Sequence, residues 1–141
     1  MANKDIVSEF VRVRGADAIP RMHRMLYIDR SITDINVKDN GDCTALHHQA
    51  HYGTTGSVAW LLRQDPPPDI NVRDSDQYTP LMMAVYSNED SEGKVRLLLD
   101  HGADRDLKDN NGYTALDNAR RNNKPAAVID MLENYRPDVS R

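Results

Sequence analysis

Residues 109–116 have the sequence Asp-Asn-Asn-Gly-Tyr-Thr-Ala-Leu, and related octapeptides occupy residues 39–46 and 74–81. Each copy starts 35 residues after the one before it, opens on an Asp and has a Thr as its sixth residue. A fixed period of this kind, within the range of roughly 20–50 residues, is typical of repeat proteins in which units stack on one another. The octapeptide and the residues that follow it therefore decide the fold.

The Thr of each copy is expected to begin a helix, because its hydroxyl can accept a proton from an amide of the first turn. Pro80 suits the first helical position, where its missing N–H costs nothing. Nine residues after the Thr stands a Gly or an Asn, the residue types that best tolerate the left-handed backbone that ends many helices. The predicted starts are Thr44, Thr79 and Thr114, and the predicted ends are Gly53, Asn88 and Asn123.

A second helix is predicted in each unit from apolar residues at i, i+3 and i+4, which form one stripe along a helix. The stripes are Val58, Leu61 and Leu62, then Val95, Leu98 and Leu99, then Val128, Met131 and Leu132. Polar segments rich in Asp, Asn and Gly separate the units and indicate turns. Trp60 lies beside Leu61 in the second helix of its unit, and we expect it to pack in the core.

The pattern Asp-x-x-Gly-x-Thr-x-Leu-His, followed by a helix pair and then Gly-Ala-Asp, resembles the ankyrin repeat. Residues 109–116 and residues 97–104, Leu-Leu-Leu-Asp-His-Gly-Ala-Asp, carry the resemblance most clearly, and it extends over residues 34–135. It implies an all-α fold, an ankyrin-repeat helical solenoid of stacked helix-turn-helix units with β-turn or hairpin loops. It also implies binding of another protein without catalysis.

The chain departs from this pattern at the turn glycine. Gly112 matches it, but Asp42 and Gln77 hold the corresponding positions. Asp tolerates a positive φ, with Gly41 next to it, whereas Gln77 predicts a shifted turn in the second unit.

We expect residues 1–141 to form a single domain of four units. They are a divergent N-terminal helical repeat over 1–33, repeats over 34–68 and 69–103, and a C-terminal repeat or cap over 104–141. In the first of them, Ile6, Phe10 and Val11 predict one helix, Gly15 its end, and residues 19–26 a second.

Composition and charge exclude several classes of function. The chain has a net charge of −4, one cysteine and an N-terminus without a continuous apolar run. We expect an intracellular, cytoplasmic protein, with the nucleus left open. The N-terminus does not resemble a secretory leader, and a single cysteine cannot form a disulfide framework. Apolar runs are too short for a membrane span, which needs about 20 residues. Residues 70–104 hold three basic and seven acidic residues, which favours a partner with a basic patch and disfavours nucleic acid.

No catalytic motif is present, so we expect neither an enzyme nor a bound cofactor or metal. Two alternatives remain open. Cys43, His47 and His51 could hold a metal, because His47 and His51 share a helix face at i and i+4. A nucleic-acid role would instead use Lys38, Arg73 and Lys108 as a basic ladder along the turns.

The resemblance places partner-binding positions around the Thr of each unit, on the concave face of the stack. Tyr and Arg are common in binding hot spots, which favours this face as the site. Tyr78 and Tyr113 also fit a second interpretation, packing against the neighbouring turn. The full set is Lys38, Asn40, Gly41, Cys43, His51 and Tyr52, then Arg73, Ser75, Asp76, Tyr78, Tyr86 and Ser87, then Lys108, Asn110, Asn111, Tyr113, Arg121 and Asn122.

The sequence therefore predicts a monomeric recognition module that acts as an inhibitor, an adaptor or a scaffold. An immunity-type or effector protein that blocks one partner enzyme is the alternative.

Overall fold

A computed structural model describes residues 4–136, and these residues form helices and no strand, which confirms the all-α prediction. The helices are α1 (Lys4–Val11), α2 (Ala18–His23), the π-helix η1 (Arg24–Ile28), α3 (Ala45–Tyr52), α4 (Thr55–Leu62), α5 (Pro80–Tyr86), α6 (Ser91–Asp100), α7 (Ala115–Arg121) and α8 (Ala126–Asn134). Within this part of the chain, no helix has the length and apolar content needed to cross a membrane.

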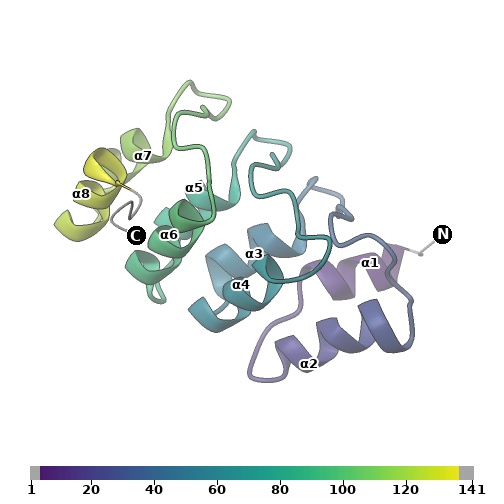
Figure 1. Cartoon of the computed structure of the whole chain (residues 1–141). Coiled ribbons are helices and arrows are strands. Elements are labelled where there is room, and N and C mark those ends of the chain that lie inside the picture. The colour runs from purple at the N-terminus through teal and green to yellow at the C-terminus, as the bar shows by residue number, and fades with distance from the viewer. Residues whose placement is uncertain (1–3, 137–141) are drawn as a thin grey trace.

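The helices stack as pairs in chain order, with the N-terminal pair at one end and the C-terminal pair at the other (Figure 1). One row contains α1, α3, α5 and α7, in which each helix packs on the next. The other row contains α2, α4, α6 and α8, packed in the same way. The long turns between pairs project along one side of the stack (Figure 1). Each unit therefore buries its apolar surface mainly against its neighbours, as in a solenoid.

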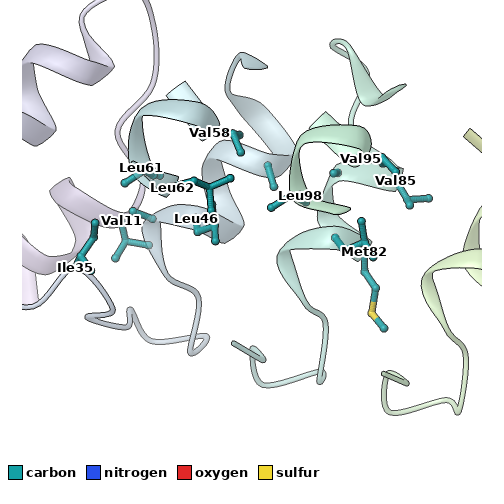
Figure 2. Packing of buried hydrophobic residues seen from close by; sticks show 14 of the residues in the cluster. Val11, Ile35, Leu46, Val58, Leu61, Leu62, Met82, Val85, Val95 and Leu98 are labelled. Carbon is teal, nitrogen blue, oxygen red and sulfur yellow. The ribbon is translucent and has the colours of Figure 1, made fainter. Parts of the chain in front are cut away.

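The predicted apolar stripes of the second helices are buried in all three units, which confirms them. Figure 2 shows Val58, Leu61, Leu62, Val95 and Leu98 of the second helices beside Leu46, Met82 and Val85 of the first helices, and all of them belong to one buried cluster. Ala50 in α3, Ala84 in α5 and Ala119 in α7 are fully buried, and their small side chains let the helices of that row approach closely. Trp60 is only half-buried against this core.

Each predicted Thr is the N-cap of its helix. The Oγ1 atoms of Thr44, Thr79 and Thr114 accept from the backbone N–H three residues later, at 3.2–3.4 Å. His47 and Asp117 return a bond to the N–H of the Thr in their units, completing a capping box.

The predicted left-handed helix ends are correct only at Asn123, which has φ 53°. Gly53 is extended, with φ −90°, and α5 ends at Tyr86 with Ser87 as its C-cap, before Asn88. Gly53 is needed for a different reason, because a Cβ at that position would collide with Gln49 and Ser57.

The shifted turn predicted at Gln77 is wrong. Asp42, Gln77 and Gly112 have φ values of 61°, 65° and 81°, so all three turns share one left-handed conformation. The Asp that opens each octapeptide explains this result. Its Oδ1 accepts two backbone N–H groups, as Asp74 does from Asp76 and Tyr78 at 2.9 Å each. This pair of bonds holds the turn even where the residue at the left-handed position is unfavourable.

Buried polar side chains join each unit to the next. Gln49 Nε2 donates to the carbonyl of Val13 at 2.7 Å, and Lys94 Nζ donates to the carbonyl of Gly53 at 2.8 Å. Lys94 is fully buried and also donates to Ser87 Oγ. Burial lowers the pKa of Lys94 below its ordinary value, because the charged amine has lost its water.

Replacing Gln77 by Gly should raise the free energy of unfolding by about 0.5 kcal/mol. Left-handed backbone costs a non-Gly residue about 1–2 kcal/mol, and the added freedom of Gly in the unfolded chain offsets about 0.4–1 kcal/mol of that gain. Urea denaturation measures the change. Gly112→Ala is the matched control: a Cβ there meets no atom within 4 Å, so it should lose about 1 kcal/mol through backbone strain. A loss of stability in Gln77→Gly would contradict the prediction.

The lowered pKa of Lys94 predicts a pH-dependent contribution to stability. Between its lowered pKa and its ordinary value of 10.5, the folded protein binds fewer protons at this amine than the unfolded chain does. Stability therefore rises with pH in that window, relative to Lys94→Met. Urea unfolding of both proteins at several values from pH 7 to pH 10 would show the difference growing in favour of the wild type. Parallel profiles would show that the amine is not perturbed by burial.

Candidate protein-binding groove

A groove of about 550 Å³ lies where α3, α5 and the turns before them meet. Residues of two consecutive units line it, which explains why neither unit alone indicates it. They are Cys43, His47, His48, His51 and Tyr52 from the first unit, and Asp74, Asp76, Tyr78, Met83 and Tyr86 from the second.

Tyr52 is the most exposed aromatic side chain of the groove, with 46% of its surface accessible. Its ring meets that of His51 edge to face, with 4.1 Å between the centroids. The guanidinium of Arg14 lies 3.8 Å above the ring, a cation–π contact. One end of the groove therefore has an aromatic surface that already holds a cation.

Tyr78 and Tyr86 form the other aromatic part of the groove, with their rings stacked 6.0 Å apart. Tyr86 Oη donates to Asn118 Oδ1 at 3.0 Å and accepts from Asn122 Nδ2 at 3.3 Å. Buried Asn118 in turn donates to Asp109 Oδ2 at 3.1 Å. Asn118 and Asn122 of the third unit thus fix the orientation of Tyr86, which belongs to the second unit.

His47 is part of the framework. Its Nε2 lies 2.8 Å from the carbonyl oxygen of Tyr78, and its Nδ1 accepts from the N–H of Thr44 at 3.1 Å. This arrangement requires the neutral ring with the proton on Nε2, and burial lowers its pKa accordingly. Both ring nitrogens are therefore occupied, so the alternative metal set of Cys43, His47 and His51 is not assembled.

The groove is negatively charged near pH 7. Burial lowers the pKa of His48 and His51, which favours their neutral forms. Burial, together with the nearby carboxylates of Asp39 and Asp74, raises the pKa of Cys43 to about 12, so its thiol is also neutral. Asp74 and Asp76 are the acidic residues of the lining, which includes neither Lys nor Arg.

Six predicted binding residues line this groove: Cys43, His51, Tyr52, Asp76, Tyr78 and Tyr86. Other predicted positions are exposed along the turn tips or at the end of α7, namely Lys38, Asn40, Ser75, Lys108, Asn110, Asn111, Arg121 and Asn122. Ser87 is only 4% exposed, and its hydroxyl accepts from Lys94, so it belongs to the interior.

The remaining predicted positions are tied to their neighbours. Gly41 accepts the N–H of Ser75 at 3.0 Å through its carbonyl, joining two turn tips. Tyr113 is half-buried beneath Arg121, whose guanidinium lies 4.0 Å from the ring. Arg73 is half-buried and donates to Gln77, so of the proposed basic ladder only Lys38 and Lys108 are exposed.

Four residues that line the groove are missing from the predicted set: His47, His48, Asp74 and Met83. His48 and Met83 both stand four residues after the Thr of their units, so an alignment of the repeats marks this position. The same position in the third unit is Asn118, which is buried. The alignment therefore identifies the fourth residue after each Thr as a candidate position. Packing against the neighbouring unit decides whether the residue there faces the groove.

Comparisons with known proteins agree with this architecture. The family model for ankyrin repeats (many copies) matches residues 61–119. The chain is 30% identical over 98 residues to delta-latroinsectotoxin-Lt1a of Latrodectus tredecimguttatus, covering 65% of the chain and 8% of the toxin. It is 40% identical over 97 residues to SMC5-SMC6 complex localization factor protein 1 of Bos taurus, covering 64% of the chain and 9% of that protein. The Homo sapiens protein of that name is 42% identical over 69 residues, covering 49% of the chain and 6% of the relative.

The match over residues 61–119 and the stacked helix pairs identify ankyrin repeats in this chain, and such repeats typically serve as protein–protein interaction modules without catalysis. The chain spans less than a tenth of the length of each of these relatives.

Replacing Asn118 by Ala should lower the free energy of unfolding by about 1–3 kcal/mol, because buried polar groups of Asp109 and Tyr86 lose a partner. Urea denaturation measures the loss. The matched variant Tyr86→Phe removes the same contact from the other side. In the double variant the two losses should fall short of their sum, because they share one hydrogen bond. Additive losses would show that the Asn118 and Tyr86 side chains are not coupled.

Proposed function

We propose that the chain binds a basic segment of another protein in the groove between its first two recognisable repeats. The observation that supports this most directly is the groove lining, which combines tyrosine rings with carboxylates and includes no Lys or Arg. Two cations outside the lining, Arg14 and Lys124, lie over the rings of Tyr52 and Tyr86. Lys or Arg on the partner would complement the carboxylates of Asp74 and Asp76. Their charged heads also favour the faces of tyrosine rings.

The energetics favour a few strong contacts. The Tyr78 and Tyr86 rings are held by stacking and by the bond to Asn118, so little side-chain entropy is lost when a partner covers them. Tyr52 is more exposed and offers a large contact area. Aromatic anchors at the centre of a patch commonly carry most of the binding energy.

In this proposal the chain acts as an adaptor, scaffold or inhibitor inside the cell, in the cytoplasm or the nucleus, and as a monomer before it meets its partner. One relative is named as a localization factor of a complex, which supports the adaptor role. The second candidate is an immunity-type or effector protein that blocks a partner enzyme, and it would use the same groove.

The test compares proteins captured from a cell lysate by immobilised wild type, Tyr52→Ala and Asp76→Lys. Tyr52→Ala removes an exposed anchor, and Asp76→Lys reverses a charge at the turn. Partners that use the groove should be retained by the wild type and lost by both variants, with the affinity of a purified partner falling at least about tenfold for each, about 1.4 kcal/mol.

Tyr27→Ala is the matched control. Tyr27 is 41% exposed, close to the 46% of Tyr52, but it lies in η1 and outside the groove. Circular dichroism and urea unfolding confirm that each variant folds. Equal capture by the wild type and both groove variants, or a loss confined to Tyr27→Ala, would reject the groove as the binding site.

A further inference from the structure

Three potential metal ligands converge at the edge of the groove. Asp39 opens the first turn, Cys43 directly precedes the N-cap of α3, and His48 lies in α3. One ligand atom from each, a carboxylate oxygen, the thiol sulfur and an imidazole nitrogen, lie within 4.8 Å of one another. The sequence predicts no bound metal, and the set that it leaves open as an alternative is a different one, with His47 and His51 in place of Asp39 and His48.

The two ring nitrogens of His48 make no hydrogen bond. Its side chain is only 15% exposed, and both ring nitrogens are buried without a hydrogen bond. Nε2 faces Asp39 Oδ2 at 3.4 Å, outside hydrogen-bonding geometry. Buried polar atoms without a partner are uncommon and costly, and the capacity to bind an ion is one ordinary reason for them.

The two carboxylate oxygens of Asp39 have different partners. Oδ1 accepts the N–H groups of Gly41 and Cys43 at 2.9 and 3.0 Å, which holds the turn. Oδ2 faces His48 and accepts from Arg12 Nε at 3.0 Å. The Arg12 side chain is 56% exposed, so it can leave for solvent at small cost.

Asp74 supplies a second carboxylate on the far side of the thiol. Its Oδ2 lies 3.8 Å from Cys43 Sγ, while its Oδ1 accepts the N–H groups of Asp76 and Tyr78. Asp39 and Asp74 thus each hold a turn with Oδ1 and direct Oδ2 toward this cluster. The hydrogen bonds that the two Oδ1 atoms accept fix both carboxylates in place before any metal binds.

The geometry points to a binding site for a divalent transition-metal ion of the Zn²⁺ type, with Asp39 Oδ2, Cys43 Sγ and a ring nitrogen of His48 as ligands. Asp74 Oδ2 or a water completes four-coordination. Oxygen, sulfur and nitrogen ligands together favour Zn²⁺ and Co²⁺ over Mg²⁺ and Ca²⁺, which bind oxygen alone. As the metal–sulfur bond forms, Cys43 releases its thiol proton to water.

The rearrangement that binding requires is small. Metal–ligand bonds of about 2.0–2.3 Å place the ligand atoms of a tetrahedron roughly 3.3–3.8 Å apart. The three atoms, now within 4.8 Å of one another, must therefore approach by about 1 Å. With both carboxylates and the thiolate as ligands, the site has a charge of −3, which a divalent cation reduces to −1.

The test titrates the full chain, stripped of metal with a chelator, with Co²⁺ and separately with Zn²⁺ in competition with a coloured chelator. We expect one metal per chain, with a thiolate-to-cobalt charge-transfer band and the strong visible absorption of four-coordinate Co²⁺. Cys43→Ser should remove the charge-transfer band. Cys43→Ser, His48→Gln and Asp39→Asn should each weaken binding at least about tenfold.

His51→Gln is the matched control, because His51 lies on the same helix and lines the same groove but is outside the cluster. The amide introduced by Asp39→Asn keeps one oxygen for the turn, and circular dichroism confirms that each variant folds. No one-to-one binding to the wild type, an unchanged affinity in Cys43→Ser, or a loss in His51→Gln with none in His48→Gln would overturn the proposal. The titration uses metal alone, so its outcome is independent of the proposed partner binding.

Discussion

The buried carboxylate that opens each octapeptide is the constraint on which the rest of the structure depends. Asp39, Asp74 and Asp109 each accept two backbone N–H groups through one oxygen and so hold three turns in one conformation. Each turn delivers a Thr to the start of the next helix and brings its tip against the adjacent tip, where Ser75 donates to the carbonyl of Gly41 at 3.0 Å. The pair of hydrogen bonds accepted by each of these Asp residues therefore sets the turn shape, the helix start and the spacing between units.

The groove follows from that regular spacing. Because α3 and α5 pack side by side with their turns in register, Tyr52 and Tyr86 lie at the edges of one hollow rather than on separate surfaces. Polar links across each junction, such as those of His47 and Lys94, hold the two walls at a fixed separation. Preformed walls lose little entropy on binding, which suits recognition by a small surface.

Much of the fold could be predicted from the sequence, and two of the errors have separate physical reasons. The Thr caps and the second-helix stripes depend on neighbours within one unit, and they are confirmed. The shifted turn at Gln77 is wrong because residue preference there yields to the hydrogen bonds of Asp74. The repeat pattern places Ser87 on the binding surface, but Ser87 is buried and its hydroxyl accepts a hydrogen bond from Lys94.

The sequence by itself determined the period of 35 residues, the helix starts and the apolar stripes, because short-range hydrogen bonding and helical periodicity set these. Only the tertiary structure decided which side chains of different units meet. Stacking placed Asp74 beside Cys43 and Asn118 beside Tyr86, and turned His47 toward the carbonyl of Tyr78 while His48 faced Asp39. These pairings depend on the rotation and spacing of one unit against the next, which is set by packing of the whole interface.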